Sequence, residues 1–355
     1  MYKVIVICYN HILNYDSNII SNKQEKIKWK LEGCKKMNSK EWFKEAKFGM
    51  MVHFGLYSVL AGEWKGKRMP YIGEWIQAYY RIPNNEYHEL AKVFNPIYFD
   101  ADEWIRVAKS GGAKYIVVTS KHHDGFALFH SKVDKFNCVD SSPFKTDIIE
   151  KLADACARQN IKLGIYYSQE LDWSHPHGGG YGADYLNLEN TTSWTNDWDF
   201  PDNSKKNYSI CFAEKIKPQM EELLKNYGKL AVMWCDMPFD ITKEQSTELY
   251  NMIKHYQPEC LVNSRMGNNV CDFGSSEDNL IVDDIGNNQI YEMPGTLNDT
   301  WGYKSFDNNW KSPEEILRIK KHLNSIGSNY LLNIGPDYLG RIPAPASEIF
   351  SKIGK

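Results

Sequence analysis

Side chains of catalytic types follow five short apolar runs of this sequence. The first run ends at His53, and the second is followed by His122 and His123. The other three runs end in further polar and aromatic residues, namely Tyr166 with Tyr167 and Ser168, Trp234 with Cys235 and Asp236, and Asn263 with Ser264 and Arg265. Paired carboxyl groups in such a set could cleave a glycosidic bond, one attacking and the other exchanging a proton. Alternatively, the three histidines and an aspartate could hold a metal ion for hydrolysis.

Local geometry weakens the metal alternative. His122 and His123 would point to opposite faces of a continuing strand, so they are poor joint ligands unless the strand has already ended. The sequence also has no H-E-x-x-H motif. Plainer interpretations exist for the carboxyl groups, because Asp236 could cap a helix after its strand and Glu277 could be an exposed loop acid. Convergence of several such residues on one edge favours a catalytic site.

The apolar runs alternate with segments of helical periodicity. Strands are predicted at residues 48–55, 115–120, 162–168, 230–236, 260–265 and 330–335, and helices at 39–47, 101–110, 145–159, 216–227, 242–256 and 312–326. Parallel strands need a crossover between them, so this alternation predicts a parallel sheet. Six such strands over about 290 residues favour a (β/α)8 barrel. A doubly wound sheet is the alternative, but its glycine-rich phosphate turn is absent from the sequence.

Composition narrows the classes of function. The chain has 355 residues and a formal charge of −3, so no basic excess favours nucleic acid as a partner. No apolar run approaches the ~20 residues of a membrane-spanning helix. Eight cysteines without C-x-x-C spacing, and an apolar opening without a clear cleavage site, predict a cytoplasmic rather than a secreted protein. Residues 1–38 are predicted to form an N-terminal arm, followed by a catalytic domain over 39–355.

Eight stretches of the sequence form a highly specific pattern when taken together: KFGMMVHFGLYSV, GEWIQAYYR, AKYIVVTSKHHDGFALF, KLGIYYSQELDW, VMWCDM, DFGSSE, NDTWGY and LLNIGPDYLGRIP. On these stretches the chain resembles the family 29 glycoside hydrolases, the retaining α-L-fucosidases, from about Trp42 to Lys355. The resemblance implies a (β/α)8-like catalytic domain, fucosylated oligosaccharides or glycoconjugates as substrates, and no metal or organic cofactor. Family members usually continue into a C-terminal β-sandwich, whereas this sequence stops just after the closing helix of the barrel is expected to begin.

The resemblance also implies roles for individual residues. It places the nucleophile at Asp236 and the acid/base at Glu277, 41 residues later. It places groups that bind fucose at His53, Glu74, Trp75, His122, His123, Tyr166, Trp234 and Arg265, with Trp301 in the apolar wall. A retaining mechanism needs its two carboxyl groups about 5–5.5 Å apart. Glu74 and Asp272 are the alternatives for the acid/base.

These roles make electrostatic demands on the site. Asp236 must stay ionised, which Arg265 or a protonated histidine nearby would favour. Glu277 must keep its proton near neutral pH, which burial or a neighbouring carboxylate would favour. Two other functions remain open at this point. One is a fucose-binding barrel without turnover, left by truncation of the sandwich, and the other is a glycosidase for a galactose-like ring.

Overall fold

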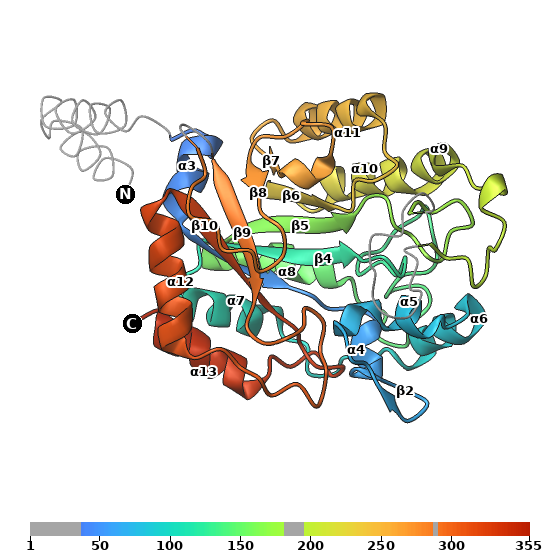
Figure 1. Cartoon of the computed structure of the whole chain (residues 1–355), viewed down its shortest axis with the longest axis horizontal. Coiled ribbons are helices and arrows are strands. Elements are labelled where there is room, and N and C mark those ends of the chain that lie inside the picture. Colours follow the sequence, from blue (N-terminus) through green and yellow to red (C-terminus); the bar gives the residue numbers. More distant parts are fainter. Residues whose placement is uncertain (1–36, 181–194, 287–289) are drawn as a thin grey trace, which may run out of the picture. The chain divides into compact units, whose positions relative to one another are not determined.

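The computed structural model describes residues 37–180, 195–286 and 290–355. The chain divides into two units, Met1–Asn38 and Ser39–Lys355. The predicted N-terminal arm over residues 1–38 lies almost entirely outside the described residues and stays a prediction. The second unit carries the helices and strands that Figure 1 labels.

Eight parallel strands form the centre of the second unit (Figure 1). Their bounds are β1 Phe48–Val52, β4 Tyr115–Lys121, β5 Lys162–Ser168, β6 Leu230–Asp236, β7 Leu261–Val262, β8 Gly274–Ser275, β9 Tyr291–Thr296 and β10 Ser328–Ile334. Neighbouring strands follow the order β7-β6-β5-β4-β1-β10-β9-β8. A parallel bridge between Asn263, just after β7, and Phe273, just before β8, joins the two edges. The prediction of a (β/α)8-like barrel is therefore confirmed.

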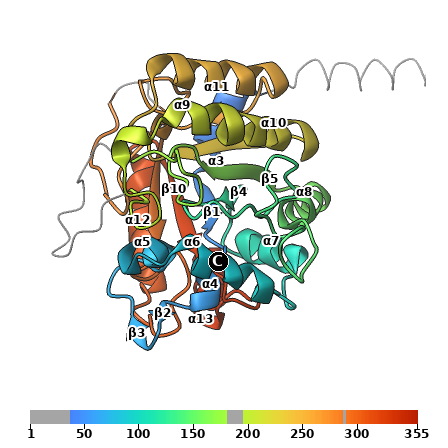
Figure 2. The same cartoon turned by 90° about the vertical axis from the view of Figure 1, so that its right-hand side faces the viewer.

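Helices surround the strands on the outer face of the barrel (Figure 2). The main ones are α7 Ala101–Ser110, α8 Ile148–Gln159, α10 Lys217–Asn226, α11 Lys243–Tyr256, α12 Pro313–Ser325 and α13 Ala344–Ile353. Four of them begin at a polar side chain that accepts a backbone N–H of the first turn, namely Asp100, Asp147, Thr242 and Ser312. Their buried faces pack with the outward residues of the strands into one large core. Within the described ranges, no helix combines the length and apolar character that crossing a bilayer requires.

Shorter elements lie in the connections. After β1 come α4 Tyr57–Leu60, β2 Glu63–Trp64, β3 Lys67–Arg68, the 3₁₀ turn η1 Gly73–Trp75, α5 Ile76–Tyr80, α6 Asn84–Tyr87 and η2 His88–Val93. Before α10 come η3 Asn203–Lys205, α9 Tyr208–Cys211 and the π-helical turn η4 Phe212–Ile216. After β7 comes η5 Ser264–Met266. The long connection after β1 supplies two of the predicted site residues, Glu74 and Trp75.

Helix α3, Ser39–Ala46, packs into the amino-terminal end of the barrel. The Phe43 ring lies 4.6 Å from the ring of Phe273 and 5.4 Å from that of Tyr115, between ring centroids. The Asn329 side chain donates to the Phe43 carbonyl oxygen at 2.9 Å and accepts from the Lys47 backbone N–H at 3.0 Å. The barrel interior is therefore a packed core.

Several elements differ from the sequence-based expectation. The strand predicted at 260–265 is shortened to β7, and η5 begins at Ser264. Strands β8 and β9 were not predicted, because β8 has two residues and β9 contains Pro294 and Gly295, which are typical of turns. In β9 the proline pairs in register with Leu331 of β10, and its carbonyl oxygen accepts the backbone N–H of Asn279 at 3.0 Å. The closing helix α13 was expected only to begin at the end of the sequence, but it is a ten-residue helix from Ala344 to Ile353.

Candidate active site

A cavity of about 590 Å³ lies at the carboxyl ends of the strands. Every residue to which the resemblance assigns a role lines it: His53, Glu74, Trp75, His122, His123, Tyr166, Trp234, Asp236, Arg265, Glu277 and Trp301. Asp272, the second alternative for the acid/base, does not line the cavity and forms ion pairs with Lys254 at 2.5 Å and Lys40 at 3.3 Å. Across the described ranges no group of three or more potential ligands is arranged to hold a metal ion.

Asp236 is the last residue of β6 and is held by two donors. The Tyr166 hydroxyl donates to Oδ2 at 2.7 Å, and the Arg265 guanidinium donates through Nη1 to Oδ1 at 3.0 Å. Asp236 is not a helix cap, because α11 begins at Lys243 with Thr242 as its N-cap. The carboxylate is 7% exposed, which leaves it accessible from the cavity. Two donors on one carboxylate stabilise negative charge at this position.

Arg265 links Asp236 to the segment that carries Glu277. Its Nη2 donates to the Ser276 carbonyl oxygen at 3.0 Å and to Asp278 Oδ1 at 2.5 Å. Of the two influences expected on Glu277, burial does not apply, because this side chain is exposed where it lines the cavity. The reason is its position just after the two-residue strand β8, outside the packed interior. Asp278, which the sequence interpretation missed, also lines the cavity and is exposed.

Glu74 is a buried acid in the cavity wall. It is 1% exposed, and its Oε2 accepts the backbone N–H of Gly302 at 2.7 Å. Burial raises the pKa of Glu74 to about 8. At neutral pH its carboxyl group is therefore mainly protonated, and a protonated carboxyl group can donate a hydrogen bond to a sugar hydroxyl.

The three histidines are neutral at pH 7. Burial lowers the pKa of His53 to about 4, and it lowers the pKa values of His122 and His123 well below the usual range. His53 Nδ1 lies 2.8 Å from Asn333 Oδ1, and His123 Nδ1 lies 2.7 Å from Ser168 Oγ. Of the two cations expected beside the nucleophile, the positive charge is therefore that of the Arg265 guanidinium and not of a histidine.

Strand β4 ends at Lys121, so both of the following histidines can line the cavity. Their ring centroids are 3.9 Å apart. The adjacent tyrosines of β5 separate as strand alternation requires, because Tyr166 lines the cavity while the Tyr167 hydroxyl donates to Gln219 in the outer core.

Three tryptophans line the cavity. The Trp234 ring stacks on Tyr166 with centroids 5.6 Å apart and an interplanar angle of 19°. The Trp301 ring lies 5.2 Å from His53, and the Trp75 ring lies 5.1 Å from His123. Such a wall of aromatic faces and convergent polar groups suits a ring that carries both hydroxyls and an apolar edge.

Comparison with known proteins decides the family. A family model described as Alpha-L-fucosidase matches residues 16–355. The chain belongs to the alpha-L-fucosidase family. The tissue alpha-L-fucosidase of Mus musculus is 30% identical over 334 residues, which cover 88% of this chain and 68% of the relative. This fucosidase is therefore a glycoside hydrolase, and it spans about two thirds of the length of that relative.

Solved structures agree with the family. The unliganded alpha-L-fucosidase AlfC from Lactobacillus casei is similar with a TM-score of 0.85 and 49% identity, covering 89% of this chain and 97% of that one. Its complex with the product alpha-L-fucose has a TM-score of 0.83 and 48% identity, with the same coverage. An alpha-L-fucosidase from Vibrio sp. strain EJY3 has a TM-score of 0.80 and 37% identity, covering 88% of this chain and 53% of that one.

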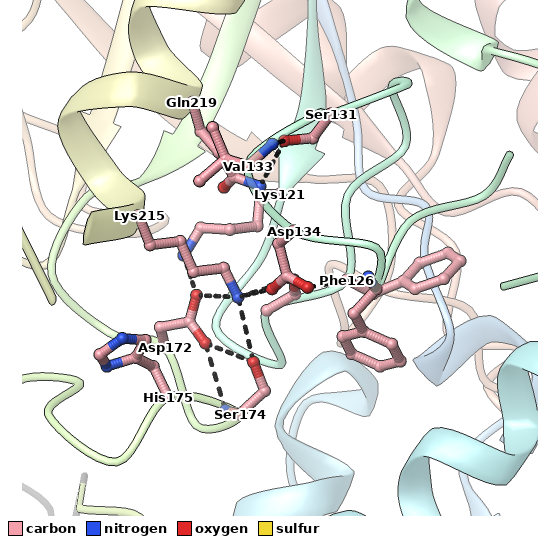
Figure 3. Close-up of polar contacts among 12 residues, drawn as sticks. Lys121, Phe126, Ser131, Val133, Asp134, Asp172, Ser174, His175, Lys215 and Gln219 are labelled. Carbon is pink, nitrogen blue, oxygen red and sulfur yellow. Dashed lines mark hydrogen bonds and ion pairs between the residues drawn. The ribbon is translucent and has the colours of Figure 1, made fainter. Parts of the chain in front are cut away.

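A largely buried ion network follows the ends of β4 and β5 in this fucosidase and was missed by the sequence interpretation (Figure 3). We define it as Lys121, Asp134, Asp172 and Lys215. Only Asp134 among its members is partly exposed, at 30%. Asp172 Oδ2 lies 3.0 Å from Lys121 Nζ and 2.9 Å from Lys215 Nζ, and Lys215 Nζ lies 2.6 Å from Asp134 Oδ2. The network joins the end of β4, the loop after β5 and the π-helical turn η4. Lysine and aspartate are rarely fully buried, so nothing in the sequence predicts that Lys121, Asp172 and Lys215 lie in the interior.

Proposed function

We propose that this chain is an exo-acting α-L-fucosidase that hydrolyses terminal α-L-fucosyl linkages with retention of configuration. Asp236 is the nucleophile and Glu277 is the acid/base. The observation that carries this proposal is the pair of donors on Asp236, because Tyr166 and Arg265 hold both oxygens of a carboxylate that remains accessible from the cavity. The packed barrel interior below the cavity suits the end of a glycan chain rather than its middle.

The mechanism has two displacements. Asp236 attacks the anomeric carbon while Glu277 protonates the departing glycosidic oxygen, which breaks the C–O bond and leaves a covalent fucosyl ester. Glu277, now ionised, then takes a proton from water, and the water oxygen displaces Asp236 from the anomeric carbon. The first step consumes the charge that Arg265 and Tyr166 stabilise, and the second step restores it. Glu277 must come about 5–5.5 Å from Asp236 in the substrate complex, and this separation stays a prediction.

The cavity offers complementary groups to fucose. Neutral His53, His122 and His123 can each donate from one ring nitrogen and accept at the other, and protonated Glu74 can donate. The tryptophan faces can cover the C6 methyl group, but a methyl pocket supplies only about 1–3 kcal/mol of discrimination. Hydroxyl contacts must therefore provide most of the selectivity against other sugars.

The substrate class follows from the family and its solved relatives. A variant of AlfC has been solved in complex with Fuca(1,6)GlcNAc, and another complex contains 4-nitrophenyl-a-L-fucopyranoside. We therefore propose fucosylated oligosaccharides or glycoconjugates as substrates and α1,6-linked fucose as the first linkage to test. We also propose a cytoplasmic location, which is supported by the free cysteines Cys138, Cys156, Cys211, Cys235, Cys260 and Cys271.

The stereochemical outcome tests the proposed function. Hydrolysis of 4-nitrophenyl α-L-fucopyranoside, followed by proton NMR during the first minutes, should show α-L-fucose first and the β anomer only after mutarotation. Two inversions at the anomeric carbon give this result. If the β anomer forms first, a single displacement operates and the retaining mechanism is wrong. Absence of turnover with normal fucose binding would favour a binding barrel instead.

Changing Glu277 should affect substrates according to their leaving group. In Glu277→Gln, we expect kcat/KM for Fuc-α1,6-GlcNAc to fall by about 10²-fold or more, because the sugar alkoxide needs a proton to depart. The loss for 4-nitrophenyl fucoside should be about tenfold or less, because nitrophenolate departs unprotonated. Initial rates with both substrates measure the ratio.

The neighbouring acid gives the matched control. Asp278→Asn removes one partner of Arg265 but leaves Glu277 in place, so it should slow both substrates by similar factors. If Asp278→Asn shows the dependence on leaving group and Glu277→Gln does not, the acid/base is Asp278 and our assignment is wrong.

A further inference from the structure

Glu292 is a buried carboxyl group inside the barrel, on β9. It is 0% exposed and is not among the residues that line the cavity. Its Oε1 accepts the indole N–H of Trp234 at 2.9 Å, and its Oε2 accepts the hydroxyl of Tyr115. Both partners are themselves buried. The carboxyl group is thus bonded through both oxygens to aromatic side chains, and neither of these partners is a cation.

Trp234 is the side chain on which both partners of Asp236 pack. The Tyr166 ring stacks on it, and the Arg265 guanidinium carbon lies 4.9 Å from its ring centroid. The indole N–H is the one hydrogen-bonding atom of a tryptophan side chain. A bond to that atom fixes the rotation of the ring within its own plane, so the bond to Glu292 decides which surface Trp234 presents to Tyr166 and Arg265.

The apolar surroundings of Glu292 indicate that its side chain has a role through its hydrogen bonds to Trp234 and Tyr115. The surrounding residues of the inner core are mainly apolar, including Val117, Val232 and Leu331. Burial raises the pKa of Glu292 to about 7, which reflects the cost of charge at this position. An aliphatic side chain would avoid that cost and would fill the space, but it would leave the indole N–H without an acceptor.

We propose that Glu292 is a positioning residue for the nucleophile. It orients the Trp234 indole, and the indole in turn keeps the Tyr166 hydroxyl and the Arg265 guanidinium aligned on Asp236. This inference rests on the proposed function, since it takes Asp236 as the attacking group. Displacement of reacting groups by about 1 Å is sufficient to lower a rate by about 10²-fold, so a residue outside the cavity can have a large effect on turnover.

A double-mutant cycle tests the proposal on the full chain. The readouts are kcat and KM for 4-nitrophenyl α-L-fucopyranoside and the thermal unfolding midpoint. We expect Glu292→Leu to lower kcat by about 10- to 100-fold, with KM changed by less than about threefold. In the Trp234→Phe background the same substitution should lower kcat by less than about twofold, because phenylalanine has no N–H to orient.

Two further variants separate orientation from structural support. Glu292→Gln keeps an oxygen that accepts the indole N–H, so kcat should stay within about threefold of the wild type. Tyr115→Phe removes the other partner of the carboxyl group and should leave kcat within about twofold. These two conservative variants carry the test if Glu292→Leu does not fold.

Specific outcomes overturn the proposal. It fails if Glu292→Leu lowers kcat by the same factor in both backgrounds, if Tyr115→Phe lowers kcat as much as Glu292→Leu, or if Glu292→Gln loses more than about tenfold with a normal unfolding midpoint. If Asp236→Ala is inactive, any of these results shows only that Glu292 does not position the nucleophile, and the proposed function is unaffected. Turnover by Asp236→Ala would instead contradict the proposed function itself, because Asp236 could not then be the nucleophile.

Discussion

We expect Asp236→Ala to lower kcat for 4-nitrophenyl α-L-fucopyranoside on the order of 10⁴-fold or more, because removal of a nucleophile eliminates the covalent path. The loss should be chemical rather than structural. Asp236 ends a strand at the cavity and bonds Tyr166 and Arg265 through its side chain only, so truncation leaves the barrel core unchanged. The unfolding midpoint and the Kd for fucose, by calorimetry, should therefore change far less than kcat.

Azide supplies the diagnostic result for the same variant. The space left by the carboxylate admits a small anion beside Arg265, and azide can attack the anomeric carbon from that side as nitrophenolate leaves. One displacement gives β-L-fucosyl azide, which NMR or mass spectrometry identifies. Asp240→Asn is a matched control, because this nearby carboxylate accepts the backbone N–H of Gly180 and does not line the cavity, so kcat should stay within about twofold. Turnover by Asp236→Ala without azide would contradict the assignment of the nucleophile.

The barrel could be predicted from the sequence because its longer elements satisfy local rules. The strands at residues 162–168 and 230–236 have the predicted bounds, and the helix at 101–110 begins after a capping aspartate and has its predicted bounds. The polar residues at the ends of such strands were sufficient to predict that the strand ends form one site. The structure brings at least one residue from each of the five strand ends into one cavity, namely His53, His122, His123, Tyr166, Trp234, Asp236 and Arg265.

The remaining features depend on contacts between distant residues. Strand β8 has two residues, which is too short for a periodic pattern to identify it. The strand predicted at 260–265 exists as β7, but only Leu261 and Val262 form it. The interior role of Glu292 depends on β9 being a strand, and Pro294 within it favours a turn on local grounds. The sequence left both a buried and an exposed Glu277 open, because the burial of this residue depends on segments that are distant in the sequence.

Lys215→Met should lower the free energy of unfolding by about 3–5 kcal/mol, because it removes one partner from a fully buried charge. The Asp172 side chain is 0% exposed and would keep only Lys121 as its cationic partner in the network. Lys217→Met provides a matched control two residues away, since its ion pair with Glu248 is 40% and 46% exposed and such pairs contribute about 0–1 kcal/mol. Urea unfolding at pH 7 measures both variants, and equal losses would contradict the role of the network.

The pH dependence of that loss gives a second test. Burial alone would raise the pKa of Asp172, but Lys121 and Lys215 outweigh it and hold the pKa well below its usual range. A carboxyl group with a lowered pKa in the folded state stabilises the protein above its unfolded pKa of about 4, and this contribution is lost as the pH falls below that value. Lys215→Met weakens the lowering of the pKa, so the difference from wild type should be greatest at neutral pH and should shrink toward pH 3. A difference that stays constant between pH 7 and pH 3 would show that the lysine stabilises the fold through its packing alone.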